Sequence, residues 1–150
     1  MSLLGRRPET RKAAALRSLP GFAALADRDL ARLTVAFDDV RVAPGTVLAR
    51  AGQVTHELIF VVEGTATATN ERTGTRAPLG RGRCVGDVAM LGHGAAPVTV
   101  VTDTAARVLV AGPRTARAAL AHPTVLRQVA TNLADQLLDP PEPLAGARAS

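Results

Sequence analysis

The sequence predicts a mainly β fold, an eight-stranded antiparallel β-roll of the jelly-roll or double-stranded β-helix type, flanked by N-terminal helices and a C-terminal amphipathic helix. Three observations predict this class. Short apolar runs separated by Gly and Pro turns recur between Asp38 and Ala111, without a helical pattern among them. Residues at helical spacing precede this region, over residues 8–37, and follow it, over residues 115–138. Short strands in this arrangement are typical of an antiparallel sandwich or roll.

The N-terminal helical region divides in two. Residues 13–17 suit a helix that ends at the breaker Leu19-Pro20-Gly21. Asp27 is predicted to be the N-cap of a second helix. The apolar positions expected on this second helix are Leu30, Leu33, Val35 and Phe37.

The central region contains the predicted strands. The run Leu58–Val62 is apolar and of strand length, whereas Thr65–Thr69 alternates strictly between small apolar and polar residues. Turns are expected at Pro44-Gly45 and Thr73-Gly74. A last strand is predicted over Arg107–Val110.

The C-terminal region is predicted to be helical. A short helix is expected over residues 115–121, and His122-Pro123 begins a longer one, because proline is favoured in the first turn. This helix is expected to end at Asp139, before two prolines. Its apolar stripe consists of Leu126, Val129, Ala130, Leu133, Ala134, Leu137 and Leu138.

The formal net charge of +5 is concentrated at the N-terminus. Residues 1–17 contain five Arg or Lys and one Glu, a balance of +4, so the rest of the chain carries +1. The expected organisation is a basic arm (residues 1–15), a domain (residues 16–138) and a flexible tail (residues 139–150). The arm either contacts nucleic acid or an acidic surface, or is a solvated helix end; the lack of a groove-reading motif favours the second reading.

Composition excludes several classes of protein. The chain has three Phe and no Tyr or Trp, so it lacks platforms for stacking bases. The single cysteine, Cys84, excludes an internal disulfide and is expected to be a buried thiol. No apolar run reaches the roughly 20 residues of a membrane span, and no signal-peptide pattern is found, so a cytoplasmic protein is expected. His56, His93 and His122 are scattered without metal-ligand spacing, so neither an enzyme nor a metal cofactor is expected.

One segment has the pattern of a phosphate-binding loop. Residues 86–89 combine a glycine, an acid and small apolar residues, where backbone amides at a helix N-terminus hold an anion. No Arg or Lys occurs between Gly86 and Ala106, however. The sequence therefore predicts a phosphate cradle without its cation.

Four motifs occur in the order typical of a known family. They occupy residues 50–53, 56–64, 79–82 and 85–91. With them, the sequence from Leu16 to Leu138 resembles the cyclic-nucleotide-binding domain shared by the bacterial catabolite activator family and the regulatory subunits of cAMP-dependent kinase. The resemblance implies the β-roll and a regulatory role.

The resemblance also implies a ligand site. In the family, the residues that match Gly86, Val88 and Ala89 belong to the phosphate-binding cassette, whose backbone amides point at the cyclic phosphate. Asp87 stands where the family usually has a glutamate that binds the ribose hydroxyl, and its side chain is one methylene shorter.

A missing arginine is the main departure from the family. Aligning Thr99 with the family's strand places Ala96 at the position of the phosphate-binding arginine, and a shift by one residue gives Ala95 or Pro97. A charge-assisted contact of about 3 kcal/mol corresponds to a factor of roughly 150 in affinity. A protonated His93 either replaces the cation in part or is simply solvated.

A second departure concerns the C-terminal helix. The hydroxyl residues that cap the adenine in the activator branch align with Pro140 and Pro141, whereas Thr131 and Asn132 lie too early. The nine residues after Pro141 leave no room for a helix-turn-helix, so direct sequence-specific DNA binding is not expected.

Two functions remain. The first is a stand-alone regulatory module with a degenerate cassette, which acts through dimerisation or an unknown protein partner and binds cAMP weakly or not at all. The terminal-helix row Leu126, Val129, Leu133 and Leu137 either forms the dimer contact or covers the roll. The alternative is a genuine cAMP or cGMP sensor that uses cassette amides and Asp87, with or without His93.

Overall fold

The computed structural model describes residues 8–86 and 95–138. Its elements are α1 (Pro8–Arg17), α2 (Asp27–Ala36), β1 (Asp38–Val42), β2 (Val47–Ala49), β3 (Leu58–Glu63), β4 (Ala66–Thr69), β5 (Arg76–Leu79), β6 (Cys84–Val85), β7 (Thr99–Thr102), β8 (Ala106–Ala111), α4 (Pro113–Leu120) and α5 (Pro123–Leu138). The strands form two antiparallel four-stranded sheets, in the orders β1-β8-β3-β6 and β2-β7-β4-β5. Apart from the β4–β5 hairpin, successive strands alternate between the two sheets, as in a jelly roll, so the predicted fold class is confirmed.

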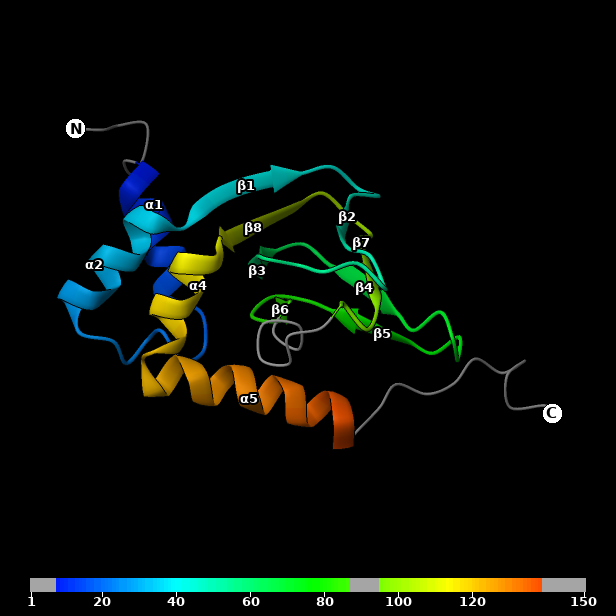
Figure 1. The fold of residues 1–150 in the computed structure, drawn as a ribbon. Helices are drawn as coiled ribbons and strands as arrows, with labels where there is room; N and C mark the ends of the chain where they lie inside the picture. The colour runs from blue at the N-terminus through cyan, green and yellow to red at the C-terminus, as the bar shows by residue number, and fades with distance from the viewer. Residues whose placement is uncertain (1–7, 87–94, 139–150) are drawn as a thin grey trace.

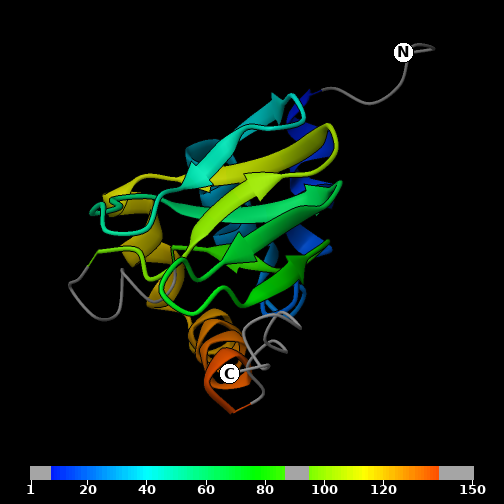
Figure 2. The same cartoon turned by 90° about the vertical axis from the view of Figure 1, so that its right-hand side faces the viewer.

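The helices lie on one side of the roll. In Figure 1, α1, α2 and α4 gather where β1 begins and β8 ends, and α5 runs below β6. Figure 2 shows the strands in front, with helices behind and below them. The helices therefore cover the sheet that contains β3 and β8.

Strand β3 is buried on both faces. Leu58, Phe60 and Val62 belong to the apolar cluster beneath the helices, whereas Ile59 and Val61 belong to the cluster inside the roll. Successive side chains of a strand point to opposite faces, so a strand between two apolar layers needs a continuous apolar run. The predicted run over these residues is that strand.

The three phenylalanines of the chain join the helices to the sheet. Phe22 follows α1, Phe37 follows α2 and Phe60 lies on β3, and each is at most 2% exposed. The ring centroids of Phe22 and Phe60 are 5.3 Å apart with an interplanar angle of 86°, and those of Phe22 and Phe37 are 6.0 Å apart at 85°. Edge-to-face packing of this kind is favourable for aromatic pairs.

Two expectations for α2 are wrong. Ala26 is the N-cap, without a side-chain cap, and Asp27 is the first helical residue, where an acid still favours the positive end of the helix. Val35 is 73% exposed, and Thr34 is buried beside it. The Thr34 hydroxyl donates to the Leu30 carbonyl at 2.7 Å, so this polar side chain is satisfied inside the core.

Part of the expected basic arm, residues 1–15, belongs to α1. Lys12 Nζ donates to the Phe37 carbonyl at the end of α2, at 2.9 Å. Arg17 Nη2 donates to Asp27 Oδ1 at 2.8 Å. These two cations therefore connect α1 to the two ends of α2. The division into arm, domain and tail stays a prediction, because both chain ends lie outside the described ranges.

Only one side of the apolar stripe expected on the C-terminal helix packs on the roll. Val125 and Val129 are at most 1% exposed, and Asn132, one turn further, is 3% exposed. Leu126 is 42% exposed, and Ala130 is exposed as well. Residues three and four apart share a helix face, so α5 turns Leu126 and Ala130 outward when its other side is buried.

Arg107 on β8 holds the edge strand β1. Its guanidinium donates to both carboxylate oxygens of Asp39, at 2.9 and 2.7 Å, and to Glu63 Oε2 at 3.3 Å. The hydrogen bond between the two side chains lowers the pKa of Asp39 and raises the pKa of Arg107. A bidentate arginine–carboxylate pair is both strong and directional, so it fixes the position of β1 against β8.

Asp39→Asn should remove part of the acid sensitivity of folding. The pKa of Asp39 is lower in the folded chain than its ordinary value of 3.8, so the pair stabilises the fold above that value and its contribution is lost as pH falls through the folded pKa. We expect a loss of about 1 kcal/mol of unfolding free energy at pH 7. In urea unfolding curves recorded from pH 7 downward, the difference from the wild type should shrink with acid. Asp38→Asn, at a position without an ion pair among the described residues, is the control; equal pH profiles for all three proteins would contradict the prediction.

Candidate functional site

Gly86 begins the predicted cassette at the end of β6. Its φ is +95°, and a Cβ there would collide with the carbonyl oxygen of Glu57, just before β3. Glycine is therefore required by the backbone at this position, whether or not a ligand binds. The next residues of the predicted site lie outside the described ranges; they are Asp87, Val88, Ala89 and His93.

The backbone around Ala96 pairs with the loop between β2 and β3. The Ala96 N–H donates to the Gln53 carbonyl at 2.8 Å, and the Ala96 carbonyl accepts the Gly52 N–H at 3.0 Å. Ala95 forms an antiparallel bridge with Val54. Ala96 itself is 7% exposed. The position that the resemblance assigns to an arginine is thus fixed by the loop and carries a buried methyl group.

The Thr99 hydroxyl is bonded within the protein. It donates to Glu71 Oε1 at 2.8 Å and accepts the Ala51 N–H at 3.0 Å, and Thr99 is 8% exposed. Nothing in the sequence marks Glu71 as a neighbour of Thr99. The contact follows from the register of β4 on β7, which pairs Thr69 with Thr99 and so brings the turn after β4 to the start of β7. The only donor hydrogen of this hydroxyl is therefore engaged by a carboxylate.

Helix α5 contacts the strand that leads into the predicted cassette. Asn132 Nδ2 lies 3.5 Å from Cys84 Sγ on β6, and Gln128 Nε2 donates to Asn132 Oδ1 at 3.4 Å. Cys84 is 2% exposed, as predicted for this thiol. A buried amide needs hydrogen-bond partners, so Asn132 connects α5 to β6 and is not directed at a base.

Two kinds of feature are absent from residues 8–86 and 95–138. No three of their His, Cys, Asp or Glu side chains are grouped so as to hold a metal ion. None of the helices described there is long and apolar enough to cross a membrane.

The match to a family model assigns the chain to a class of binding domains. Residues 39–122 match the cyclic nucleotide-binding domain model, which is more than half of the chain. The chain belongs to the cyclic nucleotide-binding domain family. No curated protein sequence matches it significantly.

Solved structures share the fold. The regulatory domain of Toxoplasma gondii PKA with cAMP superposes with a TM-score of 0.67 at 22% identity, over 89% of this chain and 52% of that one. Thermus thermophilus catabolite activator protein gives a TM-score of 0.66 at 22% identity, over 80% of this chain and 59% of that one.

A third neighbour is the regulatory subunit of a cAMP-independent protein kinase A from Trypanosoma brucei, with a TM-score of 0.69 at 20% identity over 88% of this chain and 49% of that one. A triple mutant of that protein, which includes a threonine-to-arginine replacement, is bound to cAMP in the A site. The chain spans about half the length of the kinase subunits that it matches.

Gly86→Ala should destabilise the fold without any ligand. An alanine would have to adopt a positive φ, and its Cβ would have to displace the Glu57 carbonyl. We therefore expect a loss of about 2–4 kcal/mol in the free energy of unfolding. Gly52→Ala is the matched control, because its φ is +86° but nothing lies within 4 Å of its added Cβ; its loss should be about 1 kcal/mol. Equal losses in chemical unfolding would contradict this reading of Gly86.

Proposed function

We propose that the chain is a non-catalytic regulatory module with the cyclic nucleotide-binding fold, that it acts through protein contacts, and that it binds cAMP and cGMP weakly or not at all. The observation that carries the proposal is that Ala96, which the resemblance aligns with the phosphate-binding arginine, is a buried methyl group whose backbone is held by the loop between β2 and β3. A cyclic phosphate that leaves water needs a counter-charge or several charge-assisted hydrogen bonds. Without an arginine, only hydrogen bonds from backbone amides would compensate the phosphate charge, and these are weaker than an ion pair with a guanidinium.

Glu71 adds to the unfavourable electrostatics. Its carboxylate is bonded to Thr99, three residues after Ala96 along the chain. Three residues of chain span at most about 10 Å, which is close to the screening length at physiological salt. An anion placed near Ala96 therefore meets a like charge that salt screens only in part, and this supports weak binding.

The comparisons contain a precedent for this combination. One neighbour is named as the regulatory subunit of a cAMP-independent kinase and keeps the fold, and its mutant with an introduced arginine is bound to cAMP. By analogy, the fold can be kept while the response to cAMP is lost. The alternative, a cyclic-nucleotide sensor, has its support in the family and in neighbours that are bound to cAMP.

Ala96→Arg should create measurable cyclic-nucleotide affinity. We expect the wild type to bind cAMP and cGMP with dissociation constants above about 10 μM. The introduced guanidinium should tighten cAMP binding by roughly 10- to 150-fold, because it supplies the missing charge-assisted contact. Isothermal titration calorimetry measures both, with circular dichroism to verify that the variant is folded. Ala31→Arg adds the same charge at an exposed position of α2 and is the control, which should have little effect. Saturable heat at micromolar cAMP with the wild type would establish the sensor instead.

The exposed side of α5 is the proposed contact for a second copy. Leu126 and Ala130 lie one turn apart and both are exposed, whereas Val125 and Val129 hold the other side of the helix on the roll. An exposed leucine next to a small residue suits close helix–helix packing. Leu133 and Leu137, which the sequence also assigned to this contact, have side chains outside the described part.

Leu126→Glu should convert a dimer into a monomer. A glutamate in the contact would bury an unpaired charge, which costs several kcal/mol and so weakens association by at least 100-fold. Multi-angle light scattering at tens of micromolar protein measures the mass. Thr131→Glu adds the same charge at an exposed position outside the Leu126–Ala130 row and should leave the mass unchanged. A wild type that is monomeric at this concentration would exclude the dimer.

A further inference from the structure

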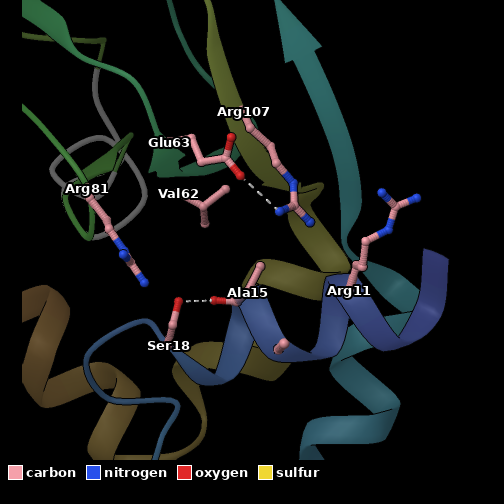
Figure 3. Close-up of a pocket in the computed structure, with 8 residues that line it drawn as sticks. Arg11, Ala15, Ser18, Val62, Glu63, Arg81 and Arg107 are labelled. Carbon is pink, nitrogen blue, oxygen red and sulfur yellow. Dashed lines mark hydrogen bonds and ion pairs between the residues drawn. The ribbon is translucent and has the colours of Figure 1, made fainter. Parts of the chain in front are cut away.

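A groove lies between α1 and the sheet that contains β3 and β8 (Figure 3). Its volume is about 290 Å³. We call it the α1 groove; it is lined by Arg11, Ala14, Ala15, Ser18, Val62, Glu63, Arg81 and Arg107.

One face of α1 forms a wall of the groove. Arg11, Ala14, Ala15 and Ser18 are spaced at i, i+3, i+4 and i+7, so they share a face of the helix. Seven residues of helix span about 10.5 Å, so Arg11 and Ser18 mark two ends of the groove. Figure 3 shows the Arg81 side chain pointing toward the Ser18 end. The two alanines leave space between the ends.

The groove carries uncompensated positive charge. Its lining has three arginines and one glutamate, a balance of +2. Glu63 is already shared between Arg107, at 3.3 Å, and Arg41, at 3.9 Å. Within the described ranges, Arg11 and Arg81 form no ion pair or side-chain hydrogen bond. One guanidinium without an acidic partner therefore comes from each side of the groove, one from α1 and one from the turn after β5.

The shape of the groove favours a peptide over a small molecule. Sites for small molecules usually enclose 300–1,000 Å³ and bury most of the ligand surface. Here Arg11, Ala14, Ser18 and Arg81 are all exposed, so the groove is open along its length. In an extended peptide, side chains two residues apart lie on the same side, about 6.6–6.8 Å from each other. Flexible arginine side chains at the two ends of a 10.5 Å face can reach two carboxylates at that spacing.

We propose that the α1 groove binds an extended acidic segment of a partner protein, in which two carboxylates separated by one residue contact Arg11 at one end and Arg81 at the other. The Ser18 hydroxyl donates to the Ala15 carbonyl at 2.6 Å, so its oxygen accepts hydrogen bonds from the segment's backbone amides. Arg107 is held by Asp39 and Glu63, which compensate its charge, so it contributes a fixed wall and leaves Arg11 and Arg81 as the cations that attract the segment. The inference rests on the proposed function in one respect, that the module acts through protein contacts, and it names the chemistry of one partner.

Fluorescence anisotropy with a labelled peptide tests the proposal. The probe is fluorescein-Gly-Ser-Gly-Glu-Ser-Glu-Gly-Ser-Gly, and the control peptide has Gln in place of both Glu. At 50 mM NaCl we expect a dissociation constant of about 1 mM or lower for the probe and at least tenfold weaker binding of the Gln peptide. Binding should weaken further at 500 mM NaCl, because exposed ion pairs are screened.

Variants locate the binding. Arg81→Ala should weaken binding by roughly two- to tenfold and the double variant Arg11→Ala, Arg81→Ala by more than tenfold. Arg72→Ala removes an exposed arginine in the turn after β4 and should have no effect beyond the loss of one charge. Equal binding by the double variant and by Arg72→Ala would overturn the proposal, as would no binding of the probe to the wild type. Succinate that displaces the peptide and binds as tightly would also overturn it, in favour of a small-dianion site.

The peptide test is independent of the tests of the proposed function. It is done without cyclic nucleotide, so micromolar cAMP binding by the wild type would overturn the proposed function and leave the peptide result unaffected. Leu126→Glu on α5 should leave peptide affinity unchanged, since Leu126 does not line the groove.

Discussion

The structure depends on the packing of Phe60 against Phe22 and Phe37. Phe60 projects from β3 into the helical layer, and the two other rings arrive from the segments after α1 and α2. Each buried phenylalanine contributes about 1.5–3 kcal/mol. Because β3 presents its alternate residues, Ile59 and Val61, to the interior of the roll, the same strand ties both apolar clusters together. A movement of the helices would therefore also displace β3, which packs against the interior of the roll through its other face.

The candidate ligand site is attached to this frame at both of its described ends. Gly86 is pressed against the Glu57 carbonyl before β3, and Ala96 is paired with the β2–β3 loop. Asn132 brings α5 to β6, next to Gly86. The described backbone on both sides of the predicted cassette is thus held by the fold itself. That Ala96 stands at the position of the family's arginine stays a prediction.

Several cationic side chains of this domain hold its helices and strands together. Lys12 and Arg17 connect α1 with α2, and Arg107 holds β1. Arg11 and Arg81 line the α1 groove. Two of the five cations that the sequence concentrates near the N-terminus thus serve the helical layer, and a third, Arg11, lines the α1 groove. This distribution agrees with a module that communicates through protein surfaces.

The sequence by itself determined the roll, the order of helices and strands, the buried thiol of Cys84 and the family, because apolar periodicity and turn residues are local properties. Through the resemblance it also predicted that Ala96 replaces the phosphate-binding arginine, which stays a prediction. The sequence misplaced the N-cap of α2, because a shift of a helix boundary by one residue changes the free energy of folding little. It also misplaced the burial of Val35, because the packing of the surrounding elements decides which face of a helix is buried. Only the tertiary structure brought Glu71 to Thr99, Asn132 to Cys84 and Arg81 to α1. These contacts join residues 28 or more positions apart, and their geometry depends on strand register and on the packing of the helices on the sheet, which no local pattern encodes.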